Sequence, residues 1–244
     1  MGSPLCIGVG DNEYFIGSDV TPFIEYTNNV VYLEDGELAI IRNHKETFYR
    51  KIVDDKPVSP TVSKLELSLD KIEKFYSNIY NSKTIPLSIG GDHLISLPIL
   101  RGIAKEKPIG LFQFDSHSDT WDTYFGGFKY THGTPFRRAI EENLIDPKKY
   151  VILGLRGALY DPEDLSWARE QGVTIITIDD YYEMGFNKCI EKIYEVLVNT
   201  DTYFTFDIDG IDPTFAPGTG TPEVGGFNVR EAQTIIRALN KYNL

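Results

Sequence analysis

The chain has 244 residues, of which 41% are hydrophobic and 25% are charged, as in an ordinary soluble globular protein of one large or two small domains. Its formal net charge of −12 argues against the phosphate backbone of a nucleic acid as a partner. No run of about 18 apolar residues occurs, so we expect no membrane-spanning helix and no membrane partner.

The N-terminus and the cysteines indicate the compartment. The first residues show no basic region followed by an apolar stretch and a small-residue cleavage site, so a secretory signal is not expected. The two cysteines, Cys6 and Cys189, form no Cys-x-x-Cys pair, which excludes a zinc–thiolate site and argues against a disulfide framework. We therefore expect a cytoplasmic protein.

The first fifty residues predict a small β-rich segment. They contain short β-branched stretches punctuated by glycine: PLCIGVG, EYFIGSD and VVYLEDGELAII. In the last of these, residues 34–36 (Glu-Asp-Gly) separate two apolar runs, a pattern that predicts a hairpin. A short helix is predicted at residues 20–26. We treat residues 1–50 as this segment and residues 51–244 as a separate α/β domain.

From about Pro57 onward, helices and strands are expected to alternate. The first helix is predicted by an apolar stripe with helical spacing, made up of Leu65, Leu69, Ile72, Tyr76 and Ile79. Strands are then predicted at 84–91, 109–115, 150–156, 173–179 and 202–209, and the helices at 96–106, 133–144, 162–172, 189–199 and 229–242. The strands are continuous apolar runs, as expected when helices cover both faces of a parallel sheet. The fold class is therefore a doubly wound α/β sheet.

Polar side chains gather where three of the predicted strands end. The first strand is followed by GGDH (90–93), the second by DSHSD (115–119) and the last by DID (207–209). Ligands bind at the carboxyl ends of the strands in such sheets, so we expect these clusters to converge. They hold two of the four histidines in the chain, and a third, His132, opens the helix after the second cluster.

This concentration of carboxylates predicts bound cations. Asp-x-His-x-Asp and Asp-x-Asp spacings place alternate side chains on one face of an extended segment. Carboxylates packed together at low dielectric repel one another strongly unless cations are present. Mixed Asp and His ligands suit a divalent metal such as manganese, and bridging carboxylates would hold two ions about 3.5–4 Å apart.

Each cluster also has a purely structural interpretation. The Asp-Ile-Asp-Gly segment can be a turn that ends a strand, His93 can be a hydrogen-bonded turn residue, and His132 can neighbour a helix cap. Asp92 and Asp122 are better explained as turn or cap residues than as ligands. The coincidence of three clusters at three strand ends favours the metal site.

The motifs GGDH, FDSHSD, HGTPFRRA and FDIDGIDPTFAPGTGTPEVGG, in this order, resemble those of the ureohydrolases, the family of arginase and agmatinase. The resemblance covers roughly residues 53–244, and its last motif is long and specific. The segments HGTPFRRA and GLRGALYDPED resemble the agmatinase and guanidinobutyrase branch more than arginase. Ser116 stands where alanine is usual. The resemblance implies the three-layer parallel sheet of that family.

The resemblance also implies two manganese ions per chain and a reaction. The implied ligands of one ion are His93, Asp115, Asp119 and Asp207. Those of the other ion are Asp115, His117, Asp207 and Asp209. Asp119 would take a proton from the metal-activated water, and His132 would bind substrate and protonate the leaving amine. The substrate would be a small cationic guanidino compound similar to agmatine, and the products would be urea and an amine. The resemblance also implies a homo-oligomer.

Two features depart from the pattern of the family. An acidic residue in a later strand helps to hold the guanidinium there, and this chain ends at Leu244, so we expect the sheet to be truncated at its C-terminal side. Residues 3–48 stand in place of the family's N-terminal part and resemble part of the glutaminase domain of glucosamine-6-phosphate synthase. That domain uses a cysteine directly after the initiator methionine, whereas Gly2 follows Met1 here.

Three functions remain open on the sequence alone. The first is a manganese-dependent amidinohydrolase of the agmatinase type. The second is a remnant or chimeric fragment that binds metal but has impaired catalysis. The third is a fragment of a glutamine amidotransferase, against which the missing N-terminal cysteine argues. Metal content, measured together with urea release from a panel of guanidines, separates the first function from the second.

Overall fold

The computed structural model describes residues 5–9, 14–17, 27, 29–33, 38–42, 45–49, 62–81, 85–124, 127–159, 161 and 163–240. These residues divide into two units, one within residues 1–71 and 79–89 and the other within residues 72–78 and 90–244. No helix in the described part of the chain has the length and apolar character needed to cross a membrane.

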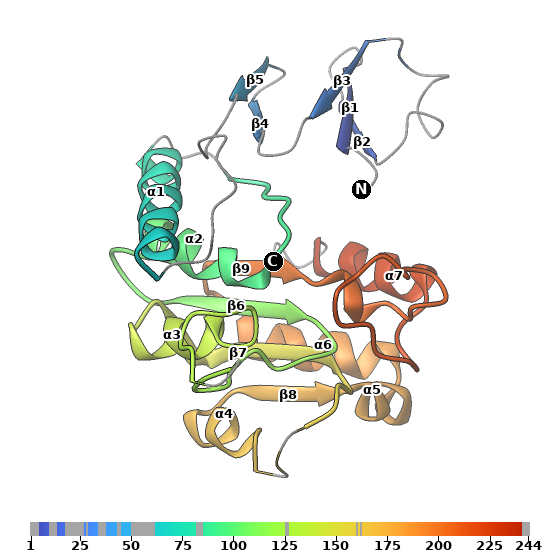
Figure 1. Ribbon diagram of the computed structural model, residues 1–244. Coiled ribbons are helices and arrows are strands. Elements are labelled where there is room, and N and C mark those ends of the chain that lie inside the picture. The colour runs from blue at the N-terminus through green and yellow to red at the C-terminus, as the bar shows by residue number, and fades with distance from the viewer. Residues whose placement is uncertain are drawn as a thin grey trace. The chain divides into compact units, whose positions relative to one another are not determined.

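The first unit contains two small antiparallel sheets (Figure 1). In one, β1 (Leu5–Val9) lies between β2 (Tyr14–Gly17) and β3 (Val30–Leu33). In the other, β4 (Leu38–Arg42) pairs with β5 (Lys45–Tyr49). The predicted β-rich segment is therefore confirmed, and β5 is a strand that the sequence pattern did not reveal.

The hairpin predicted around residues 34–36 is wrong, because β3 pairs with β1 and β4 pairs with β5. The reason is a competing partner: β3 pairs with β1, where Ile7 lies between Ile16 and Val31 in register, and so does not pair with β4. Residues 34–37 themselves, and the helix predicted at residues 20–26, lie outside the described residues.

Helix α1 (Val62–Asn81) contains all five residues of the predicted apolar stripe. Leu69, Tyr76 and Ile79 are buried, whereas Leu65 near the start of the helix is exposed. The close approach of Gly102 shows how tightly part of this stripe packs, since a Cβ on Gly102 would lie 2.7 Å from the Cβ of Tyr76.

The second unit is built on a four-stranded parallel sheet with the strand order β8-β7-β6-β9 (Figure 1). The strands are β6 (Ile109–Phe114), β7 (Ile145–Leu155), β8 (Thr174–Thr177) and β9 (Thr202–Phe206). The helices are α2 (Ser96–Ile103), α3 (Pro135–Glu141), α4 (Ser166–Gln171), α5 (Ile178–Met184), α6 (Phe186–Leu197) and α7 (Val229–Asn240). This arrangement confirms the predicted parallel α/β fold.

Successive side chains along each strand point to opposite faces of this sheet. Phe112 and Phe114 of β6 stack on Phe204 and Phe206 of β9, with ring centroids 5.3 and 4.5 Å apart. Phe112 and Phe114 belong to the core that α5, α6 and α7 cover, and Phe206 packs against it. Gln113, which lies between them in sequence, points to the opposite face, where α2 and α3 pack. The sheet is therefore the middle one of three layers.

The strand predicted at residues 84–91 is wrong. Residues 85–90 form no strand, and residue 84 lies outside the described part of the chain. Ile85, Leu87 and Ile89 are 93%, 73% and 51% exposed. Their alternation fits a strand, but a strand also needs a hydrogen-bonded partner, and no described strand pairs with this segment.

Capping residues decide two of the helix boundaries. A capping box at Thr177 ends β8 and starts α5, which the sequence pattern did not reveal: Asp180 N donates to Thr177 Oγ1 at 3.0 Å, and Thr177 N donates to Asp180 Oδ2 at 2.9 Å. Asp179, predicted as the end of a strand, is therefore helical. A second capping box joins Asn228 and Glu231, since the backbone N–H of each donates to the side chain of the other at 2.9 Å.

A bulge in β7 at Gly154 lies directly behind the end of β6. The register with β8 shifts there, and Gly154 has a φ of 105°, which disfavours any residue with a side chain. A Cβ at this position would lie 2.8 Å from Cε2 of Phe227 and 3.1 Å from the carbonyl oxygen of Asp115. The glycine therefore allows the core and the end of β6 to pack closely together.

We expect Gly154→Ala to lower the free energy of unfolding by about 2–5 kcal/mol, of which about 1–2 comes from the backbone conformation and about 1–3 from overpacking. Gly127→Ala is the matched control, because Gly127 has a similar φ of 112° and a Cβ added there would meet no atom within 4 Å. In urea unfolding, the control should lose only the part of the unfolding free energy that comes from the backbone conformation, about 1–2 kcal/mol. Equal losses for the two variants would contradict the packing argument.

Candidate metal centre

The ends of β6 and β9 bring two of the predicted clusters together. Asp207 N donates to Phe114 O at 2.8 Å, so the hydrogen-bond ladder continues past both strands. Side chains two residues apart in a strand point to the same face of the sheet. Asp115 therefore points to the same face as Gln113, and Asp207 to the same face as Thr205, which is the face where α2 lies. The third cluster reaches the same place through the short 3-10 helix η1 (His93–Ile95), which begins there.

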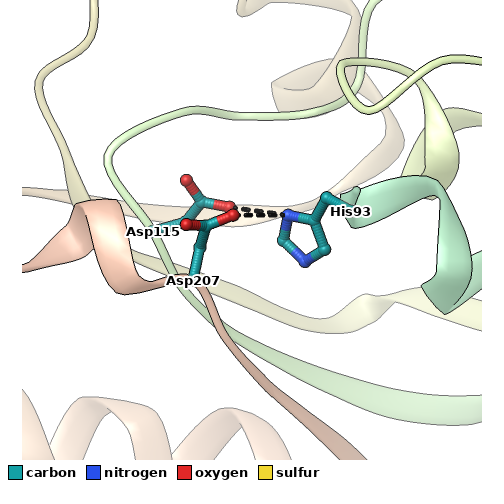
Figure 2. Close-up of side chains that lie close together, drawn as sticks. All are labelled: His93, Asp115 and Asp207. Carbon is teal, nitrogen blue, oxygen red and sulfur yellow. Dashed lines mark ion pairs between the residues drawn. The ribbon is translucent and has the colours of Figure 1, made fainter. Parts of the chain in front are cut away.

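Three carboxylates converge on one ring nitrogen of His93. Its Nδ1 lies 2.8 Å from Asp119 Oδ2 and 3.2 Å from both Asp115 Oδ2 and Asp207 Oδ2; Figure 2 shows the last two contacts. His93 is buried, and none of these contacts has hydrogen-bond geometry. A ring nitrogen carries at most one proton, so it cannot satisfy three carboxylates. The arrangement instead fits a cation bound among the four side chains.

Asp115 also belongs to a second group, with His117 and Asp209. His117 Nδ1 lies 3.1 Å from Asp209 Oδ2 and 3.7 Å from Asp115 Oδ1. Asp115 thus turns Oδ2 toward His93 and Oδ1 toward His117. A carboxylate that presents one oxygen to each of two clusters has the geometry of a ligand bridging two cations.

The donor chemistry of the two groups fits divalent metals that accept both oxygen and imidazole ligands. In each histidine Nδ1 faces the carboxylates, and Nε2 has a different neighbour. His93 Nε2 lies 2.9 Å from Thr205 Oγ1, and His117 Nε2 lies 3.5 Å from Glu223 Oε1. Partners at the second ring nitrogen fix the orientation of a histidine that binds metal through the first.

Without cations, the negative charge is offset by protons on the histidines. Burial acts to lower the pKa of His93, but the carboxylates of Asp115, Asp119 and Asp207 raise it well above its usual value. Burial likewise opposes protonation of His117, and its contact with Asp209, followed by the charges of the other aspartates, raises its pKa to about 9.

The carboxyl groups respond in different directions. Burial, with the charge of Asp119 added, raises the pKa of Asp115 well above its usual value, and burial also raises the pKa of Asp119. Burial has the same tendency at Asp209, but hydrogen bonds from His117 and Ser116 lower its pKa overall. The serine contact is direct, since Ser116 Oγ donates to Asp209 Oδ1 at 2.7 Å.

Asp119 is held in an unusual backbone conformation. Its φ of 50° lies in the left-handed region, which few residues other than glycine adopt. Its carbonyl oxygen accepts a hydrogen bond from Phe136 N at 3.2 Å, which ties it to the start of α3, while its carboxylate faces His93. Backbone strain of this kind concentrates at functional sites.

His132 lies in the loop between β6 and α3 and belongs to neither ligand group. Its Nδ1 lies 3.7 Å from Asp92 Oδ2, and its ring meets that of Tyr124 edge-on at 5.3 Å. A backbone hydrogen bond of 3.1 Å from Trp121 N to Gly133 O joins this part of the loop to the segment that follows Asp119.

Asp92 and Asp122 have structural partners, as the sequence indicated. Asp92 caps η1 by accepting a hydrogen bond from Leu94 N at 2.9 Å. Asp122 accepts a hydrogen bond from Arg138 at 2.8 Å.

Sequence reasoning does not identify several residues that support the site. Gln113 Nε2 donates to Asp115 Oδ2 at 2.7 Å, and the signal that could have found it is a polar residue in an otherwise apolar strand. Arg156 donates to the carbonyl oxygens of Asp209 at 2.7 Å and of Glu223 at 2.8 Å, and so joins two loops at the site. Its position after β7 gave no such signal.

Comparisons with known proteins agree with this geometry. The arginase family model matches residues 33–244, a range that begins earlier than the motifs indicated. Guanidinopropionase of Pseudomonas aeruginosa is 48% identical over 190 residues, which are 78% of this chain and 59% of that protein. Guanidinobutyrase of the same organism is 42% identical over 174 residues, which are 71% of this chain and 54% of that protein.

A solved structure shares the fold. Proclavaminate amidinohydrolase from Streptomyces clavuligerus aligns with a TM-score of 0.66 and 37% identity, covering 72% of this chain and 58% of that one. The chain thus spans little more than half the length of these relatives. Because the family match covers most of the chain and includes every residue of both ligand groups, the chain belongs to the arginase family, the ureohydrolases.

Proposed function

We propose that the chain hydrolyses a small guanidino compound to urea and an amine, using two manganese ions. The observation that carries this proposal is the convergence of three carboxylates on buried His93 Nδ1, with Asp115 shared by a second group. The proposed ligands of one ion are His93, Asp115, Asp119 and Asp207. Those of the other ion are Asp115, His117, Asp207 and Asp209.

The proposed reaction assigns proton transfers to two residues. When bound, a pair of divalent cations activates water and stabilises the charge that develops on the substrate. Asp119, whose buried carboxylate lies 2.8 Å from His93 Nδ1 among the proposed ligands, takes the proton from the attacking water. The water oxygen bonds to the guanidinium carbon, and His132 gives a proton to the leaving nitrogen as its bond to that carbon breaks.

The proposed substrate is agmatine-like, a guanidinium on a short linear chain. The net charge of −12 and the concentration of carboxylates favour a cationic substrate. Two relatives are named for guanidino compounds, guanidinopropionase and guanidinobutyrase, which supports the substrate class. Agmatine is the compound that we propose within it.

Three further parts of the proposal concern the chain as a whole. We propose that residues 51–244 form the hydrolase domain and that residues 1–50 form a separate segment. We also propose a cytoplasmic location, in keeping with Cys189, which is a buried free thiol. As in the family, the hydrolase is proposed to act as a homo-oligomer.

Chelator-stripped protein should release no urea from agmatine, and adding manganese should restore release. The panel to be measured is agmatine, 4-guanidinobutyrate, 3-guanidinopropionate and arginine, with urea determined directly. Protein that binds two manganese ions per chain and releases no urea from any of these compounds would instead be a metal-binding protein with impaired catalysis.

Asp207→Asn should weaken manganese binding by about 100-fold or more, because it removes a ligand and not merely a residue that supports one. Asp146→Asn is the matched control, since Asp146 lies near the start of β7, at the amino ends of the strands and away from the ligands at their carboxyl ends. Equilibrium dialysis followed by metal analysis measures both. If Asp207→Asn keeps the affinity of the control, the ligand assignment is wrong.

The metal-free protein should lose stability as the pH rises from 6.5 toward 9. His117 has a pKa of about 9 when folded and 6.5 as the ordinary value, so its contribution is full below 6.5 and is lost as the pH passes 9. The loss in unfolding free energy should be about 1–3 kcal/mol, measured by urea unfolding in chelator. Manganese-loaded protein should lack this decline, because metal replaces the proton on His117. A flat metal-free profile would contradict this account.

A further inference from the structure

A buried chain of hydrogen bonds runs from the middle of the sheet to Asp115. The Tyr150 hydroxyl of β7 donates to Gln113 Oε1 of β6. Gln113 Nε2 donates to Asp115 Oδ2 at 2.7 Å and to the carbonyl oxygen of His117 at 3.2 Å. Tyr150, Gln113 and Asp115 are each 0% exposed, so solvent water does not compete for these bonds.

Charge determines the direction of this chain. The Gln113 amide turns its NH₂ group to the carbonyl oxygen of His117, which can only accept, and to Asp115 Oδ2. Its oxygen then faces Tyr150 and needs a donor. Burial raises the pKa of Tyr150 well above its usual value, so the hydroxyl keeps its proton and donates. The Tyr150 hydroxyl therefore donates to Gln113, and Gln113 in turn donates to Asp115.

We propose that Gln113, held in place by Tyr150, is a positioning residue that orients Asp115 to bridge the two cations. This inference rests on the proposed function, since it requires cations in both ligand groups. Gln113 holds Oδ2, and the backbone N–H of His117 holds Oδ1 at 2.8 Å. The carboxylate is thereby oriented before metal arrives, so binding does not have to order it.

Packing alone does not account for a glutamine at this position. The rest of β6 is apolar and buried, and a polar side chain in such a strand is unfavourable unless every polar atom finds a partner. An apolar residue would fill the same space beneath Tyr150 without that requirement. The polar pair is explained by what it does to Asp115, since supporting contacts behind metal ligands set both their orientation and their affinity.

Manganese titration of the full, chelator-stripped chain tests this inference. We expect Gln113→Leu to bind manganese about 10–100-fold more weakly and Tyr150→Phe to show a smaller loss in the same direction. The double variant should bind no more weakly than Gln113→Leu alone, because Tyr150 acts only through Gln113. Tyr181→Phe is the matched control: it removes a hydroxyl from a buried tyrosine across the sheet and should stay within about twofold of the unaltered chain.

Two results would overturn the inference. The first is that folded Gln113→Leu or Tyr150→Phe binds manganese as tightly as Tyr181→Phe does. The second is that the fold-loss of manganese affinity in the double variant equals the product of the fold-losses in the two single variants. Circular dichroism checks the fold of each variant. If Gln113→Leu does not fold, Tyr150→Phe still decides, since it removes a single oxygen atom. An unaltered chain that binds no manganese would overturn the proposed function itself, so the two failures are distinguishable.

Discussion

Repulsion among aspartates at the carboxyl edge of the sheet is the constraint on which the second unit depends. Asp115 and Asp209 are 0% and 2% exposed, and Asp119 is 6% exposed, so water cannot screen their charges. The metal-free chain offsets this charge with protons, as the raised pKa values of His93 and His117 indicate. The aspartates at this end of the sheet therefore need positive charge close by, and without cations the protonated His93 and His117 supply it.

The alternation of the strands lets the protein tolerate such a site. The face of β6 that carries Asp115 also carries Gln113, and the opposite face carries Phe114, which stacks on Phe206 and packs against Phe227. The polar side chains of the site and the apolar side chains of the core thus lie on opposite faces of the same strand. The apolar cluster around Phe114 draws on α5, α6 and α7, so this part of the packing energy lies away from the charged groups.

The convergence of the polar clusters could be predicted from the sequence pattern. Asp115 and His117 are spaced along one extended segment, and parallel strands end at a common edge. The strand at residues 84–91 and the hairpin at residues 34–36 were wrong because pairing is decided by distant partners, which a local pattern does not contain. The contact between Gln113 and Tyr150, 37 residues apart, was unpredictable for the same reason.

The separation of the two faces bears on how metal and folding are coupled. In small metal-binding domains the ion supplies much of the folding energy, so the apoprotein is unfolded. Here a buried cluster that includes Phe112, Phe114 and Phe227 is complete without the ligand side chains. The hydrogen bonds to Asp115 and those from Arg156 to the loops at the site are likewise made between protein groups alone. Residues such as Gln113 lie outside this cluster, so we expect changes at them to act on the affinity for metal more than on the fold.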